Sequence, residues 1–364
     1  APKVGTIHDK HFVVAGDSSQ KNTIFFSGVN EVNNFSAATA GNISLEDAVV
    51  GIKSFRNELF IFCRESIHKL ININDSSTIA IVPVTDNVGC LDGQSIQEIA
   101  GDLIFLAPDG FRTVAGTSRI GDIELSSISK QIQPLVQKIA ERINSFTISS
   151  VVIGDRSQYR LFYVDAGSDT TSSSKGIIGT LRPGSTANPN AGFQWSETLG
   201  IQCPAITAGF DNNGLEKYFH GDLEGRVFKH DEGNSFNGSN VIAEYETPNI
   251  DYGDLGTLKT LHFIKISFGP EGEVTPVLRV RYNYDDPNHP QPADYTLDRI
   301  PPPSLFGEAK FGIGAVFGAS EKPLVRQQLQ GSGHSNMFRI RSDDTKSPYT
   351  VNGFFVDYVP SGRR

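Results

Sequence analysis

Cysteine, methionine and tryptophan are scarce in this chain of 364 residues, which contains three cysteines, one methionine and one tryptophan. Cys63, Cys90 and Cys203 are widely spaced and form no Cys-x-x-Cys pair, so neither a zinc knuckle nor a disulfide framework is indicated. Cys63 lies in an apolar run, where we expect a reduced core residue. No apolar run approaches the ~20 residues of a membrane helix, and no basic-then-apolar leader begins the chain. The sequence therefore predicts a protein assembled in a reducing cytoplasm without membrane insertion.

The motifs of common enzymes and cation sites are also absent. The chain has no His-Glu-x-x-His zinc motif, no Gly-x-Ser-x-Gly elbow and no Asp-x-Asp-x-Asp-Gly calcium loop. Asp285, Asp286, Asn288 and His289 stand together, but Asp-Asp-Pro-Asn is ordinary turn chemistry, so we expect a solvated hairpin tip there. The sequence predicts no catalytic residue, no cofactor and no metal site, and hence no enzyme.

Two further patterns have structural explanations. The glycines of Phe311–Gly318 follow a G-x-G-x-x-x-G spacing, but no βαβ pattern surrounds them. We expect a closely packed strand at that place rather than a phosphate-binding loop. His220, His230, His262 and His334 stand isolated among turns and strands, and we interpret them as structural.

The composition indicates an all-β protein. Glycine and proline are abundant, at 36 and 19 residues, whereas 38% of residues are hydrophobic and 20% charged, as in a turn-rich globular protein. The formal net charge is −9 and the pI about 5.4. Because an acidic surface repels phosphates, sequence-specific binding of nucleic acid is disfavoured.

One short pattern recurs along the first two-thirds of the chain: a β-rich run, a turn with Gly or Asp, and a second β-rich run. The copies begin about 40 to 55 residues apart, the spacing of four-stranded propeller blades, and span 11–28, 52–71, 96–114, 151–165 and 206–229. We therefore predict a β-propeller over residues 1–240. Since the chain starts with Ala rather than Met, the sequence leaves open whether an initiator residue or a longer N-terminal piece precedes the first repeat.

Local signals place several elements in this propeller. In Ala107-Pro108-Asp109-Gly110, proline presets φ and glycine accepts a positive φ, which predicts a hairpin. Apolar residues at three- and four-residue steps predict one short helix near 134–144, begun by Pro134 and packed on the core. The small polar stretches 168–175 and 184–192 are expected to be exposed loops.

Longer alternating strands and proline-rich links follow Asn240, so residues 241–364 are predicted to form a β-sandwich-like C-terminal domain. In Leu278–Tyr282 the two arginines should face one way and the apolar residues the other.

Several passages, in this order, resemble the propeller of bacteriophage tail nozzle or tail-hub proteins. They are Asn22–Gly28 followed by Asn33-Asn34-Phe35, Gly101–Leu106 with Asp109–Arg112, Gly121–Leu125, and the ending from Gly331–Ser335 to Pro360–Arg364. The resemblance covers most of the chain.

This resemblance implies a structural ring of the virion tail, six-fold and placed below the portal and adaptor, that forms the DNA ejection channel. Its implied partners are copies of itself, portal or adaptor proteins, tail fibre or needle proteins, and DNA in transit. An acidic wall suits such a channel because it does not hold phosphates. Interfaces in the ring were expected at blade-edge loops and at the helix near Leu135, with Leu135→Asp and Ile139→Asp abolishing the ring.

The alternative is a glycan-binding or glycan-cleaving propeller, such as a tail-associated hydrolase or receptor-binding protein. Propeller glycosidases place paired carboxylates and arginines around a central pit. The residues that would serve are Asp155, Asp165, Asp222, Glu224, Arg112, Arg156 and Arg226. Against it, the repeated S-x-D-x-G-x-T-W box of sialidases is absent and Trp195 is the single tryptophan for stacking on sugars.

Overall fold

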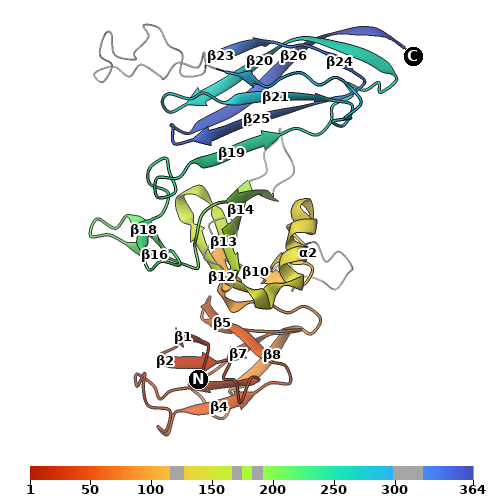
Figure 1. Ribbon diagram of the computed structural model, residues 1–364. Helices are drawn as coiled ribbons and strands as arrows, with labels where there is room; N and C mark the ends of the chain where they lie inside the picture. The colour runs from red at the N-terminus through yellow and green to blue at the C-terminus, as the bar shows by residue number, and fades with distance from the viewer. Residues whose placement is uncertain (115–126, 166–173, 183–191, 298–322, 364) are drawn as a thin grey trace. The chain divides into compact units, whose positions relative to one another are not determined.

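The computed structural model describes residues 1–114, 127–165, 174–182, 192–297 and 323–363 (Figure 1). Contacts divide the chain into an N-terminal unit, Ala1–Asp231, and a C-terminal unit, Glu232–Arg364. The division lies a few residues before the predicted boundary at 240/241. Each unit is described by itself.

The N-terminal unit is a succession of antiparallel sheets, each formed by strands consecutive in the chain. The first two sheets are β1 (Val4–His8), β2 (His11–Ala15), β3 (Thr23–Phe26) and β4 (Gly41–Ser44), then β5 (Val49–Phe55), β6 (Glu58–Cys63), β7 (Ile67–Ile71) and β8 (Ala80–Thr85). The third contains β9 (Gln97–Ile99), β10 (Asp102–Ala107) and β11 (Gly110–Thr113). The last two are β12 (Phe146–Ile153), β13 (Gln158–Asp165), β14 (Ser174–Arg182) and β15 (Gly192–Leu199), then β16 (Ala205–Phe210), β17 (Glu216–Gly221) and β18 (Val227–Lys229).

These sheets are propeller blades, as the sequence predicts. The first strands of neighbouring sheets lie side by side: β1 contacts β5, β9 contacts β12, and β12 contacts β16. The short 3-10 turn Gly93–Ser95 contacts both β5 and β12 and leads the chain into β9. The fold class is therefore all-β, with each blade beginning at its innermost strand.

Apolar side chains fill the gaps between consecutive blades. One cluster joins the first and second sheets and includes Val13, Ile24 and Ile61. The next joins the second and third, where the rings of Phe62 and Phe105 lie 5.3 Å apart. Both faces of β6 are thus buried, as its continuous apolar sequence predicts.

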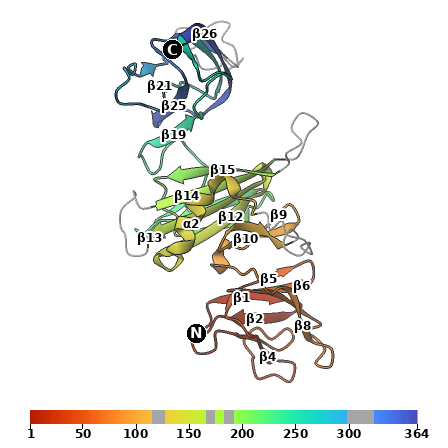
Figure 2. The ribbon, with the colours of Figure 1, turned by 90° about the vertical axis from the view of Figure 1, so that its right-hand side faces the viewer.

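The predicted hairpin and helix are both present in the third and fourth blades. Ala107 pairs with Gly110 across a two-residue turn, and α2 spans Gln133–Glu141 with Pro134 in its first turn. The helix packs through Val136 and Ile139 against residues of β11, β13 and β14, beside the sheet of β12–β15 (Figure 2). Because Ile139 belongs to the core, Ile139→Asp would unfold the unit rather than test an interface.

The third gap is organised around one aromatic stack. The ring of Phe111 stacks on Trp195 at 4.8 Å and meets the edge of Tyr159 at 5.5 Å. Gly179 faces Trp195 across the β14–β15 pair, and a Cβ there would lie 2.6 Å from the indole ring. A side chain at position 179 would therefore displace the tryptophan.

The C-terminal unit is a β-sandwich of two four-stranded sheets (Figure 1). One sheet contains β19 (Val241–Glu246), β25 (Asn336–Asp344), β21 (Val277–Tyr282) and β22 (Tyr295–Thr296). The other contains β20 (Thr257–Pro270), paired with β23 (Leu324–Gln328) and β24 (Ser332–Gly333) on one side and with β26 (Tyr349–Arg363) on the other. Leu278, Val280 and Tyr282 are buried in the core between the sheets, and Arg279 and Arg281 face outward toward Asp294, as predicted.

Some sequence expectations fall outside the described residues. These are the loop 184–191, most of the loop 168–175, the glycine-rich Phe311–Gly318 and nearly all of the Gly121–Leu125 passage. Ser174 and Lys175, predicted to end a loop, instead begin β14. All three cysteines are free and buried, and burial raises the pKa of each thiol to about 12. Among the described helices, none has the length and apolar character needed to cross a bilayer.

Candidate functional site

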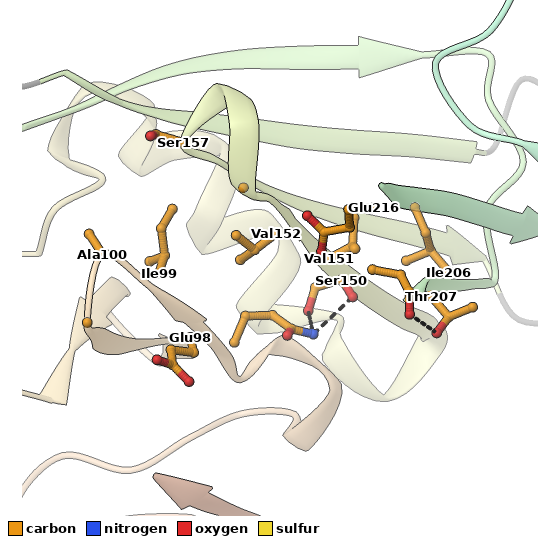
Figure 3. Close-up of a pocket in the computed structure, with 14 residues that line it drawn as sticks. Glu98, Ile99, Ala100, Ser150, Val151, Val152, Ser157, Ile206, Thr207 and Glu216 are labelled. Carbon is orange, nitrogen blue, oxygen red and sulfur yellow. Dashed lines mark hydrogen bonds between the residues drawn. The ribbon is translucent and has the colours of Figure 1, made fainter. Parts of the chain in front are cut away.

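A cavity of about 640 Å³ opens between the inner strands of the third, fourth and fifth blades (Figure 3). Its walls come from β9, β12 and β16, together with the start of β17. Ile99, Val151, Val152, Ile206 and Ala208 give much of the wall a small apolar surface. The site is a concave pocket at the inner strands, the kind of place where ligand sites are usually found.

Hydrogen bonds between blades fix the polar part of this wall. The Gln97 side-chain amide donates to the carbonyl of Ser150 at 3.0 Å and to its hydroxyl at 3.1 Å (Figure 3). The Ser150 hydroxyl in turn donates to the carbonyl of Gln94. These polar atoms are satisfied within the protein, so they hold β9 against β12.

Two carboxylates line the cavity, Glu98 on β9 and Glu216 on β17. Figure 3 shows them separated across the cavity, on different walls. Glu216 accepts a 2.6 Å hydrogen bond from the Tyr218 hydroxyl, which also accepts from the backbone amide of Gly154 at 3.2 Å. Desolvation and the bond to Glu216 raise the pKa of Tyr218 to about 12. The lining residues include no arginine, lysine, histidine or aromatic ring.

The carboxylates and arginines considered for a glycan site do not converge on this cavity. Arg112 is buried and pairs with Asp109, and Asp165 pairs with Arg142 at 3.0 Å. Asp222, Glu224 and Arg226 form a local cluster in the β17–β18 turn. Each pair is therefore satisfied within or next to its own blade.

Asp155 and Arg156 lie in the 3-10 turn Gly154–Arg156, on the same side of the fourth blade as the cavity rim. Arg156 reaches Asp231 at 3.1 Å, at the end of the fifth blade. This contact belongs to a second polar cluster, which the sequence did not reveal because its members are up to 75 residues apart.

That second cluster joins the fourth and fifth blades. We call it the lock and define it by Arg160, Asp231, His230 and His220. Arg160 on β13 donates to both carboxylate oxygens of Asp231, at 2.7 and 2.8 Å, and to Nε2 of His230 at 2.9 Å. His230 Nδ1 lies 3.2 Å from His220 Nδ1. The interpretation of His220 and His230 as isolated was therefore wrong, since antiparallel pairing of β17 and β18 brings them together.

The arginine decides the tautomer of His230. A guanidinium only donates, so Nε2 of His230 must accept and its proton lies on Nδ1, which donates to His220. Burial lowers the pKa of His230 to about 4 and also lowers the pKa of His220. Burial alone would raise the pKa of Asp231, but the bonds and charge of Arg160 outweigh it and the pKa falls. The lock holds a neutral histidine beside an ion pair.

We expect the N-terminal unit to lose stability as the pH falls from about 6.5 to about 4. The folded pKa of His230 lies below its ordinary 6.5, so in this window the unfolded chain binds a proton that the folded chain does not. The loss should be on the order of 2 kcal/mol, measured by urea denaturation at a series of pH values. His230→Gln, which keeps a donor and an acceptor but does not titrate, should flatten this dependence.

The turn around Asp285, Asp286, Asn288 and His289 follows β21. The Asp286 carboxylate accepts from the backbone of Asn288 at 2.9 Å, and His289 Nε2 lies 2.7 Å from the carbonyl of Ser332. No group of metal-binding side chains is found among the described residues. The segment is built as a turn.

No protein-family model matches the chain, and no curated protein matches its sequence. Several solved structures are weakly similar. Exo-β-1,3-galactanase from Phanerochaete chrysosporium with galactose is 10% identical over 98% of this chain and 69% of that chain, with a TM-score of 0.23. With β-1,3-galactotriose it is 11% identical over 97% and 94%, with a TM-score of 0.29. A luciferin-regenerating enzyme is 7% identical to this chain, with a TM-score of 0.25. The match covers 63% of this chain and 59% of the enzyme's chain.

These similar structures are enzymes, which contradicts the expectation that the chain is not one, and that expectation is withdrawn. Likeness of this size gives neither an activity nor a substrate.

Proposed function

We propose that the protein is a structural subunit of a bacteriophage tail, which assembles with copies of itself into a ring around the path of the ejected DNA. The observation that supports this proposal is that the outer faces of the first and fifth blades expose apolar side chains, which on the fifth blade lie beside Lys217 and Lys229. Portal or adaptor proteins and tail fibre or needle proteins would be its neighbours in the virion.

The first of these surfaces, the first-blade outer face, comprises Ile7, Phe12, Phe25 and Phe35. Ile7 pairs with Phe12 on the side of the sheet turned away from the core cluster, and the rings of Phe12 and Phe35 lie 6.4 Å apart. Ile7 is 66% exposed, and Phe35 is exposed as well. The side chains of this face are aliphatic and aromatic, like those that fill the gap between the first and second blades.

The second surface, the fifth-blade outer face, comprises Ala205, Thr207, Phe219 and Val227. These residues share one side of β16–β18 by strand register, while Tyr218 on the other side contacts the fourth blade. Val227 is 74% exposed, and Phe219 is exposed to a lesser degree.

The first-blade and fifth-blade outer faces are two different surfaces of the same chain. A contact between them in two copies would be head-to-tail. In such a contact the fifth-blade outer face of one copy would pack on the first-blade outer face of the next, and a rotation that closes gives a ring. Burying aromatic and aliphatic side chains on both partners supplies the free energy, at roughly 25 cal/mol per Å². The acidic chain, with a formal net charge of −9, would let DNA pass without holding it.

The ring proposal is tested by Val227→Asp combined with Phe219→Asp. A charge on each of these exposed positions should prevent association while leaving the fold intact, because neither side chain is in the core. Light scattering and negative-stain microscopy should show a ring of wild-type protein and monomers of the variant. Leu215→Asp, an exposed apolar position in the β16–β17 turn, is the matched control and should still assemble. A wild-type monomer at high concentration, or rings of the double variant, would contradict the proposal.

A glycan-cleaving propeller is the second candidate, favoured by Glu98 and Glu216 on opposite walls of the inner cavity. A pair of carboxylates flanking a bond is the usual apparatus of glycoside hydrolysis. Turnover of β-galactan oligosaccharides that disappears in Glu98→Gln and in Glu216→Gln would support this candidate. Turnover that survives both changes would exclude the pair.

A further inference from the structure

The outer side of one sheet of the C-terminal unit carries aromatic and cationic side chains together. We call this surface the aromatic–cationic face and define it by Phe263 and Lys265 on β20, Arg326 on β23, and Phe355 on β26. The strands β23, β20 and β26 lie next to one another in that order (Figure 1). Their alternate residues, such as Ile264 and Ile266, fill the core, so these four point away from it.

The two cations face each other without a matching anion. Lys265 and Arg326 are directly opposite across the β20–β23 pair, an arrangement that destabilises a sheet when the charges are alike. Neither takes part in an ion pair found among the described residues. The arginines of the other sheet differ, since Arg279 pairs with Asp294 and Arg339 with Glu246.

Both cations instead lie against an aromatic ring. The Arg326 guanidinium carbon is 4.2 Å from the centroid of Phe263, and the Lys265 ammonium is 5.5 Å from it. Contact with a ring face orients a cation but does not neutralise it. An incoming anion would therefore find two positive groups already positioned within one small area.

Next to the cations is an exposed apolar surface. The ring of Phe355 lies 6.4 Å from that of Phe263 with a tilt of 39°, and Phe355 is 58% exposed. Leu324, at the start of β23, is exposed on the same side. Two neighbouring rings on an open sheet offer a platform for a flat ligand.

The acidic residue on this side has a partner of its own. Asp357 is opposite Phe263 in the strand register, and its carboxylate lies 3.5 Å from Nδ1 of His262. It borders the aromatic–cationic face. Gln328, opposite Phe263 on β23, is exposed and adds a polar side chain at the other border.

We infer that the aromatic–cationic face binds a carboxylate-bearing saccharide. Arg326 and Lys265 would hold the carboxylate through charge-assisted hydrogen bonds, and the apolar side of the sugar ring would lie on the exposed ring of Phe355. Single-stranded nucleic acid fits less well, because its binding grooves follow the backbone with many positive charges, whereas this face has two and the chain carries −9. The inference does not depend on ring assembly or on the inner cavity.

Binding is measured on the full chain by calorimetry with a galacturonate oligosaccharide, a neutral galactose oligosaccharide and a single-stranded oligonucleotide. The acidic sugar should bind and the other two should not. Arg326→Ala and Phe355→Ala should each weaken binding at least about tenfold, a difference of 1.4 kcal/mol. Added salt should weaken it too, since the site is open to solvent.

Arg339→Ala is the matched control, because Arg339 also lies on an outer sheet face but is paired with Glu246. It should leave the affinity unchanged. Both test residues are exposed, so their variants should fold, which circular dichroism verifies. The inference is overturned if the acidic sugar does not bind, if Arg326→Ala binds as wild type does, or if the oligonucleotide binds more tightly through the same residues.

Discussion

Replacing Arg160 with methionine is expected to lower the free energy of unfolding of the N-terminal unit by about 3–5 kcal/mol. Only 5% of Arg160 is exposed, and it supplies hydrogen bonds to Asp231 and His230. Methionine fills a similar volume but leaves the partly exposed carboxylate of Asp231 and the buried imidazole nitrogen of His230 without this donor. The cost comes from the groups left unpaired rather than from the loss of one charge.

Urea denaturation measures this effect, and the single tryptophan, Trp195, reports on the N-terminal unit by fluorescence. Arg156→Ala is the matched control because Arg156 contacts the same carboxylate but is half exposed. A partly solvated pair of this kind contributes about 0–1 kcal/mol. If the two variants were equally stable, the lock between the fourth and fifth blades would not be a stabilising element.

Phe111→Ala is expected to cost about 3–5 kcal/mol, as large-to-small changes of buried aromatic residues do. Phe111 is fully buried, stacks on Trp195 and meets Tyr159 edge to face. Its removal opens a cavity in the core shared by β11, α2 and the fourth blade, because strands on both sides limit how far that core can collapse. The two aromatic contacts add to the loss of buried area.

The matched control is Phe210→Ala, the same substitution at a position of the same unit that is 77% exposed. We expect a change within about 0.5 kcal/mol, as for most surface substitutions. Denaturation should be followed by circular dichroism, because Trp195 fluorescence itself changes when its stacking partner is removed. Equal losses in the two variants would show that the third blade gap is not a packed core.

Local signals in the sequence predicted much of the fold. The turn at Ala107–Gly110, the continuous apolar run of β6 and the helical spacing near Pro134 are each decided within a few residues, by turn chemistry or by periodicity. The alternation in Leu278–Tyr282 similarly predicted which residues face the core of the sandwich. In each case the information lies in the same segment as the structure that it specifies.

The candidate sites were not predictable in the same way. The glycan-site carboxylates and arginines were chosen as residue types at blade turns, yet Asp222 and Arg226 satisfy each other locally. Nothing in the neighbouring sequence of Glu98 or Glu216 marks these residues, and only the packing of β12 between β9 and β16 brings them to one cavity.

The sequence by itself determined that this protein is built of antiparallel strands, because glycine and proline turns and alternating apolar residues act over short distances. The tertiary structure decided which distant groups meet: Arg160 with Asp231, Glu98 with Glu216 around one cavity, and Lys265 opposite Arg326. The physical reason is that charge pairing and cavity shape depend on the order and register of strands, which no short segment encodes.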